Sequence, residues 1–429
     1  MIEQRRRGIA LARLLSSAVI SQALLSAGNF IIGLILIRNT SDVQYGYYVL
    51  VFSAILLLTS LHNAFFNPSL STRLPKLDKK ERSELIGGLY RAQLRLFPIF
   101  GVIVVLIAIA LWYMGILNSD TGPLLVAAVI AILAILHREY FRKVLFAHRR
   151  PQNVLHTDIF YVLFAVLGVY FATFTSAPAV VAVIALCFAA IVSSILLFRT
   201  LHRYEPWDNQ GVKGILREIA PLAAWSTAGA GIHWSFSQGY IYLVASTLGV
   251  TAVSAVAATR ILMTPMNLLS IGIGSLMLPL ASKWLHEHGT REVWRRLLLF
   301  SLGLATMTLI YLAILWWMRD WVFGTMLKKD FAQRDELLMF WGAIVLVVVI
   351  RDQLVYLLAA QSRFQTLTLF TLVCAVISLI ASYIGMLQFG VSGALIGMLI
   401  GEVINLLGIV ILSMRSTQTL LSETVRSTA

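Results

Sequence analysis

The chain has 429 residues, of which 59% are hydrophobic and only 13% are charged, and its mean hydropathy is +0.83. Soluble domains are less apolar and about twice as charged, so this composition excludes an ordinary soluble globular protein. The chain also carries 34 Lys and Arg against 20 Asp and Glu, a net charge of +14. Such an excess suits nucleic acid binding only if it gathers on one soluble surface.

Apolar stretches long enough to cross a bilayer recur along the whole chain. A bilayer core of about 30 Å needs roughly 20 mostly apolar helical residues per crossing. We therefore predict an all-α polytopic membrane protein with twelve transmembrane helices. Breaks at charged residues and at Pro, Gly and Asn clusters place these helices at 14–37, 45–66, 86–117, 123–147, 154–174, 178–199, 220–249, 253–281, 297–318, 338–360, 364–385 and 391–413.

The basic residues are distributed by side of the predicted membrane. With the N-terminus inside, 27 of the 34 Lys and Arg fall in inner segments and five in outer segments, while Arg260 and Arg351 lie inside predicted helices. This asymmetry follows the positive-inside rule and predicts that both termini are cytoplasmic. Topology therefore explains the charge, and we expect no nucleic acid partner.

The two halves of the chain resemble each other. At an offset of 213 residues, Arg138 and Glu139 fall on Arg351 and Asp352, as expected of an internal duplication. Six crossings per half is an even number, so the repeat is predicted to give two parallel six-helix bundles. The predicted organisation is an N-terminal bundle at 1–199, a cytoplasmic linker at 200–219 and a C-terminal bundle at 220–429.

Motifs that would define several enzyme classes are absent from the sequence. There is no GxxxxGK[ST] phosphate loop and no HExxH. The longest predicted outer connection, 319–337, is too short for a catalytic domain. Cys187 and Cys374 both fall in predicted helices, where we expect small apolar packing residues. We therefore predict that the protein is not an enzyme and has no catalytic residues, no metal site and no cofactor.

Charges at membrane depth are the main functional candidates, because they are costly to bury there. Arg260 and Arg351 are predicted to meet a phosphate-bearing head group, since a guanidinium donates bidentate hydrogen bonds to phosphate. For Arg351 and Asp352, an ion pair that closes one conformational state is an equal alternative. Adjacent helix residues point about 100° apart, so each charge is expected to meet a partner on another helix or in the cleft and not to pair with its neighbour.

Four charged residues are candidates for gating or ion coupling: Arg138, Glu139, Asp352 and Glu402. Arg138 and Glu139 lie toward the inner end of their predicted helix, where we expect long side chains to snorkel to the interface. Glu402 lies midway through the last predicted helix. It is predicted either to bind a coupling proton or sodium ion or to form a paired structural group.

Two predicted helices carry a polar stripe on one face. The first has Gln22, Ser26 and Asn29, and the seventh has His233, Ser237 and Tyr240, at the three- and four-residue spacing of a helical face. The stripes indicate a hydrated, substrate-binding cavity, with helix packing as the alternative.

Two further features are predicted to shape the helices. Gly393, Gly397 and Gly401 recur every four residues, which lets two helices approach closely. Pro265 is predicted to interrupt the helix at 253–281, because proline removes a backbone hydrogen bond.

Three segments carry a resemblance to a known family: LIRNTSDVQYGYYVLVFS (36–53), REYFRKVLFAHRRP (138–151) and ATRILMTPMNLLSIGIGSLMLPLASKW (258–284). With the twelve predicted helices, they resemble the polysaccharide flippases of the Wzx type, in the superfamily that also contains the MATE drug exporters. The resemblance implies a protein of the bacterial cytoplasmic (inner) membrane that moves an undecaprenyl-diphosphate-linked oligosaccharide by alternating access. It implies that arginines in the cavity meet the diphosphate, and Arg260 and Arg351 are the candidates.

The same resemblance implies the partners. These are the lipid-linked oligosaccharide, membrane lipids, and the polysaccharide polymerase and export machinery, with coupling to a proton or sodium gradient. The main alternative is a MATE-like cation-coupled exporter of cationic drugs, whose site would favour acidic residues. An O-antigen polymerase or ligase is disfavoured by the short outer loops.

Overall fold

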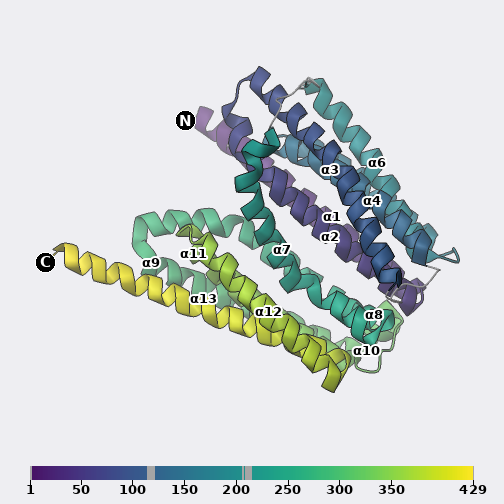
Figure 1. Ribbon diagram of the computed structural model, residues 1–429. Helices are drawn as coiled ribbons and strands as arrows, with labels where there is room; N and C mark the ends of the chain where they lie inside the picture. Colours follow the sequence, from purple (N-terminus) through teal and green to yellow (C-terminus); the bar gives the residue numbers. More distant parts are fainter. Residues whose placement is uncertain (1, 114–120, 205–206, 208–214, 429) are drawn as a thin grey trace. The chain divides into compact units, whose positions relative to one another are not determined.

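The computed structural model describes residues 2–113, 121–204, 207 and 215–428 (Figure 1). In this part of the chain all regular structure is helical, which confirms the predicted all-α fold. The helices are α1 (Ile2–Asn39), α2 (Asp42–Arg73), α3 (Lys79–Tyr113), α4 (Gly122–Ala147), α5 (Pro151–Ala172), α6 (Pro178–Tyr204), α7 (Ile215–Leu248), α8 (Val250–Ile261), α9 (Thr264–Trp317), α10 (Arg319–Trp321), α11 (Arg334–Ala360), α12 (Phe364–Phe389) and α13 (Val391–Thr428), with a 3₁₀ turn η1 (Leu74–Lys76) and a π turn η3 (Val322–Leu327).

The helices account for the twelve predicted crossings. Ten helices in the described part are long and apolar enough to span a membrane. The 34-residue α7 is long enough but more polar, because its stripe interrupts the apolar residues. The long α9 breaks at Gly289, whose φ of 75° is non-helical, and folds back on itself (Figure 1). Its first arm continues α8 as the predicted helix at 253–281, and its second arm is the next crossing.

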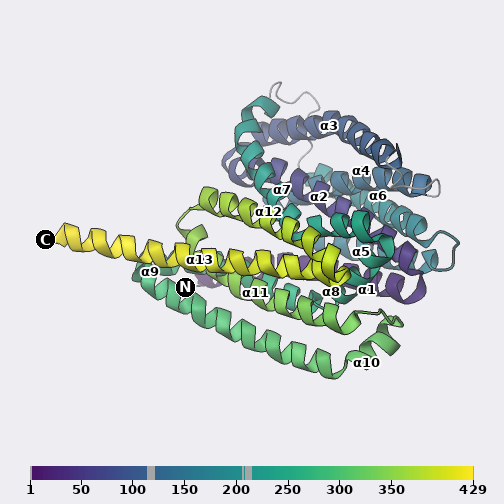
Figure 2. The ribbon, with the colours of Figure 1, turned by 60° about the horizontal axis from the view of Figure 1, so that its bottom comes forward.

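The chain forms two compact units, Met1–Gly231 and Ile232–Ala429. In the first unit α4 packs on α2 and α6, and α5 packs on α1 and α6. In the second unit α13 packs on α11 and α12, and α9 packs on α11, as Figure 2 shows. The predicted division at 200–219 stays a prediction, and residues 205–206 and 208–214 of that linker lie outside the described residues.

Helix ends repeat between the two units. The chain leaves α4 and α11 through the same turn, in which Arg149 (φ 56°) and Ser362 (φ 59°) are left-handed. In each turn the next backbone amide, that of Arg150 or Arg363, donates a 3.0 Å hydrogen bond to the carbonyl five residues earlier. This pattern is a Schellman cap. The starts of α5 and α6 also recur 213 residues later as the starts of α12 and α13. The duplication inferred from the sequence is therefore visible in the backbone.

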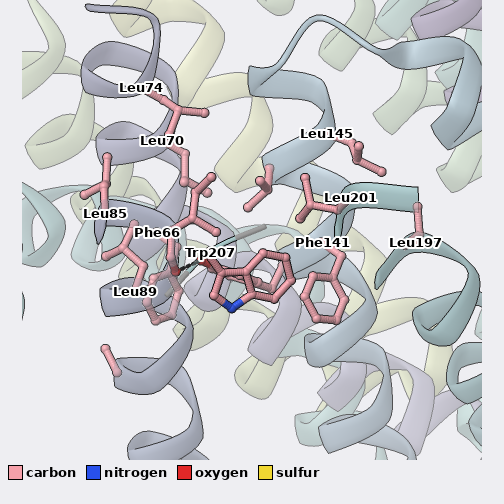
Figure 3. Packing of buried hydrophobic residues seen from close by; sticks show 14 of the residues in the cluster. Phe66, Leu70, Leu74, Leu85, Leu89, Phe141, Leu145, Leu197, Leu201 and Trp207 are labelled. Carbon is pink, nitrogen blue, oxygen red and sulfur yellow. Dashed lines mark hydrogen bonds between the residues drawn. The ribbon is translucent and has the colours of Figure 1, made fainter. Parts of the chain in front are cut away.

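An apolar core joins the ends of α2, α3, α4 and α6 in the first unit. Trp207 completes it, with ring centroids 5.3 Å from Phe198, 5.9 Å from Tyr90 and 6.0 Å from Phe141. Aromatic pairs at these distances stabilise a core beyond their buried area. Figure 3 shows the cluster, with Phe66, Leu70, Leu74, Leu85, Leu89, Phe141, Leu145, Leu197, Leu201 and Trp207 labelled.

Glycines let α12 and α13 approach backbone to backbone. A Cβ added to Gly393 would fall on the backbone of Gly385, and a Cβ on Gly397 would fall on the backbone of Ser382. The Ser382 hydroxyl donates to the Ala394 carbonyl across the same contact, at 2.9 Å. This confirms the predicted role of the glycine repeat.

The predicted break at Pro265 is confirmed. α8 ends at Ile261 and α9 begins at Thr264, with Pro265 in its first turn. The first-turn N–H groups of a helix have no intrahelical acceptor, so a proline there costs the helix no hydrogen bond. Tyr311, on the second arm of α9, donates its hydroxyl hydrogen to the Leu262 carbonyl at 2.6 Å. The break leaves Arg260 in the last turn of α8, where the helix dipole favours a cation.

Candidate functional site

Four charged side chains form a buried cluster in the first unit, which we call the first charge cluster: Arg138, Glu139 and Arg142 of α4 with Asp158 of α5. Asp158 is fully buried and Arg138 is 2% exposed. One Asp158 oxygen pairs with Arg138, and the other accepts from Arg142 Nε at 3.1 Å. Glu139 lies 3.0 Å from Arg138 and 3.6 Å from Arg142. Two cations and two anions make the cluster neutral, as burial requires.

Neutral groups from two more helices complete the first charge cluster. The Ser21 hydroxyl of α1 donates to Asp158 and accepts from Arg142 Nη2 at 3.0 Å. Ser193 of α6 accepts from Arg138 Nε at 3.0 Å. The Arg138 guanidinium also lies 3.8 Å from the centre of the Tyr161 ring. The cluster therefore ties α1, α4, α5 and α6 together.

Two expectations about α4 are wrong. Arg138 and Glu139 do not snorkel, since both are buried, and Arg138 lies nine residues before the end of its helix, as Arg351 does in α11. Adjacent residues also pair, Arg138 with Glu139 and Arg351 with Asp352. The arginine side chain is long enough to span the angle between neighbours. The expectation of a partner on another helix is confirmed for both arginines.

The second charge cluster consists of Arg351 and Asp352 of α11 with Glu402 of α13. Arg351 Nη2 lies 2.7 Å from Asp352 Oδ1, and Arg351 Nη1 pairs with Glu402. Glu402 is 3% exposed, whereas the Asp352 side chain is 37% exposed. His233 of α7 interacts electrostatically with both Arg351 and Asp352. Arg351 therefore pairs with two carboxylates, which accords with the ion-pair alternative.

Arg260 has a different environment, because neutral groups hold it. Its Nη1 donates to Gln238 Oε1 at 2.6 Å and to the Tyr240 hydroxyl at 3.2 Å, both from α7. Its guanidinium lies 5.3 Å from the centre of the Trp341 ring of α11, within cation–π range. Among the residues that the structure describes, no carboxylate forms an ion pair with Arg260. Its side chain is half-buried.

If α8 begins at the edge of a bilayer core, Arg260 lies near the middle of that core. Arg260 lies ten residues after the start of α8, which is about 15 Å along a helix that rises 1.5 Å per residue. Half of a bilayer core is also about 15 Å.

The polar stripes present some of their residues at the surface of their unit. On α1, Gln22 and Asn29 are exposed and Ser26 is half-buried. On α7, His233 is exposed and Ser237 is half-buried, its hydroxyl 3.4 Å from the Trp234 carbonyl. Exposed amides and imidazole gain nothing from hydrocarbon, so these faces suit water. The hydrated cavity stays a prediction.

The structure brings some of the predicted site residues together. Tyr240 joins Arg260, and Asp352, Glu402 and His233 join Arg351, all in the second unit. Tyr240 is only 2% exposed and acts as a buried partner of the arginine.

Sequence reasoning missed several partners of the arginines. Asp158 had a detectable signal, since it is an acidic residue inside a predicted apolar helix. Nothing in the sequence pattern distinguished the others, which are Ser21, Arg142, Ser193, Gln238 and Trp341.

Comparisons with known proteins place the fold. No protein-family model and no curated protein sequence matches the chain. Among solved structures, an inward-facing MATE family multidrug resistance transporter of the MOP superfamily has a TM-score of 0.77 at 14% identity, covering 96% of this chain and 99% of that one. The lipid II flippase MurJ, in an inward closed conformation, has a TM-score of 0.71 at 13% identity, covering 91% and 86%.

A third similar structure is a MOP superfamily transporter from Pyrococcus furiosus, described as having a binding pocket of reversed polarity. It has a TM-score of 0.69 at 12% identity and covers 96% of both chains. These likenesses extend over nearly the whole chain, and the protein therefore has the MATE-like fold of two six-helix halves.

Proposed function

We propose that the protein moves an undecaprenyl-diphosphate-linked oligosaccharide across the bacterial cytoplasmic membrane by alternating access. The observation that carries this proposal is Arg260, a guanidinium on the apolar helix α8 that is held by Gln238, Tyr240 and Trp341 without an ion-paired carboxylate among the described residues. A charge in such a place is costly. The cost is offset when an anion arrives, and a diphosphate supplies oxygens that match the guanidinium fork.

The fold suits this substrate because similar folds are found both in a multidrug resistance transporter and in a lipid II flippase. The polar head must cross hydrocarbon, so it needs a wet, cationic route. Gln22 and Asn29 of α1 in the first unit and His233 of α7 in the second unit are exposed, so each of these two helices offers a polar face that suits sugar hydroxyls. The polysaccharide polymerase and export machinery would then take up the delivered oligosaccharide.

The second charge cluster would have a separate role in the cycle. It carries one excess carboxylate, and Asp352 is its exposed member. A proton or sodium ion taken up there would balance the charge and loosen the pairing with Arg351. We propose that Asp352 and Glu402 couple transport to such a gradient, and that the first charge cluster keeps its own bundle rigid.

The test is complementation of a strain that lacks the gene. We expect Arg260→Gln to slow delivery of lipid-linked repeat units by about 100-fold, because a charge-assisted bidentate contact is lost. Arg260→Lys keeps the charge but loses the fork, and it should be slowed by about tenfold. The measurement is the amount of repeat unit that accumulates on the cytoplasmic leaflet.

The control is Arg363→Gln, which removes an exposed arginine from the turn after α11 and should deliver at the wild-type rate. If the deletion strain becomes sensitive to cationic dyes while its surface glycan is normal, the protein is an exporter and the proposal is wrong. If the Arg260→Gln variant delivers repeat units at the wild-type rate, Arg260 does not bind the diphosphate during transport.

A further inference from the structure

The two basic segments that the sequence places at inner helix ends meet in one pocket of the first unit. LDKKERSE (77–84) precedes and begins α3, and HRRPQN (148–153) follows α4. A pocket of about 260 Å³ is lined by Lys79 and Arg82 from the first segment and by His148 and Arg150 from the second. We infer that this pocket is a binding site for a phosphate group, separate from the residues proposed for transport.

The pocket is lined by both polar and apolar side chains. Leu145 of α4 and Leu201 of α6, both fully buried, line it and are labelled in Figure 3. Tyr204, near the end of α6, also lines it and supports Arg150, whose guanidinium lies 3.6 Å from the centre of its ring. Stacking immobilises the guanidinium and leaves its in-plane N–H donors directed outward.

Two of the three acidic residues in the first segment, Asp78 and Glu81, bind each other's backbone amides. The Glu81 amide donates to Asp78 Oδ1 at 2.8 Å, and the Asp78 amide donates to Glu81 Oε2 at 3.2 Å. This reciprocal capping box holds both carboxylates at the start of α3. Lys79 and Arg82 line the pocket instead, and among the residues that the structure describes no carboxylate lines it.

The turn after α4 brings the other cations into place. Arg149 has a left-handed backbone, and this Schellman cap reverses the chain so that His148 and Arg150 both reach the pocket. Three permanent cations in one pocket repel one another. Lys79 and Arg150 have no ion-paired carboxylate among the described residues, so a bound anion would reduce this repulsion.

The size and charge of the pocket define its ligand. Drug-sized ligands need about 300–1,000 Å³, so a site of about 260 Å³ suits a small group. A phosphate offers several oxygens to lysine and arginine donors at once. Two sources share this chemistry, the head group of an anionic membrane lipid and a free phosphate. The second unit repeats the turn but has Gln361 where the first has His148.

The experiment uses purified, delipidated full-length protein. Phosphatidylglycerol and diacylglycerol, which differ in the phosphate, are titrated, and bound lipid is counted by native mass spectrometry. We expect one phosphatidylglycerol to be retained specifically. Lys79→Gln and Arg150→Gln should each weaken it by about tenfold, and the double variant by about 100-fold, since each charged contact is worth at least a factor of ten.

The matched control is Arg363→Gln, at the same position in the turn of the second unit, which should bind as the wild type does. Calorimetry with inorganic phosphate distinguishes the sources. If free phosphate binds with the same dependence on Lys79 and Arg150, the ligand is a free phosphate. If only the lipid binds, the phosphate arrives on a head group.

The inference is overturned if the double variant, shown by circular dichroism to be folded, retains phosphatidylglycerol like the wild type. Equal retention of diacylglycerol would overturn it as well. If the double variant does not fold, the single Arg150→Gln variant gives the same comparison, because Arg150 is exposed. These results do not depend on what the protein transports.

Discussion

Replacing Asp158 with leucine is expected to lower the free energy of unfolding by about 3–5 kcal/mol, the cost of breaking a buried ion pair. Asp158 is fully buried and binds Arg138 and Arg142 at once. Without it the first charge cluster keeps two cations and only Glu139 as an anion. An arginine cannot shed its proton to escape burial, so the bundle must admit water or open. Thermal unfolding of the purified protein in detergent measures the loss.

Two further variants test whether the loss of stability comes from the buried charge. Asp320→Leu removes a carboxylate that pairs with Arg334 at 2.7 Å but is 68% exposed, and such surface pairs contribute at most about 1 kcal/mol. The double variant Arg138→Met, Asp158→Leu removes one charge of each sign and leaves the pair of Arg142 with Glu139. It should recover most of the lost stability. Equal melting temperatures for Asp158→Leu and Asp320→Leu would show that the cluster is not a buried, dry network.

Helix positions were predictable from the sequence because hydrocarbon thickness sets a length and charged residues set the ends. The repeat was visible because Arg138 and Glu139 fall on Arg351 and Asp352, and the same offset relates the turns at Arg149 and Ser362. The two arms of α9 belong to separate predicted helices at 253–281 and 297–318, and the non-helical Gly289 (φ 75°) between them agrees with that division.

Charge pairing was only partly predictable, because it depends on which helices become neighbours. The equivalent arginines Arg138 and Arg351 find their second carboxylates on different helices, Asp158 on α5 and Glu402 on α13. No periodicity in a single sequence encodes that choice. The sequence also did not predict that uncharged side chains surround Arg260, since Gln238 and Trp341 come from two other helices.

Substituting Gly397 with alanine is expected to cost about 3 kcal/mol of unfolding free energy, a large effect for a single methyl group. The added Cβ would lie 2.5 Å from the Ala381 carbonyl carbon and closer still to the backbone of Ser382. A backbone cannot move aside as a side chain can, so α13 must shift away from α12. The thermal unfolding midpoint measures the cost.

The matched control is Gly303→Ala, at an exposed position of α9 with no atom within 4 Å of the new methyl group. It should be neutral or stabilise by up to about 1 kcal/mol, because alanine favours helices over glycine. The shift of α13 should also affect transport, because Glu402 on this helix forms the ion pair with Arg351. We therefore expect Gly397→Ala, and not Gly303→Ala, to reduce transport as well as stability. Equal stability of the two variants would mean that close contact between α12 and α13 does not hold the second charge cluster together.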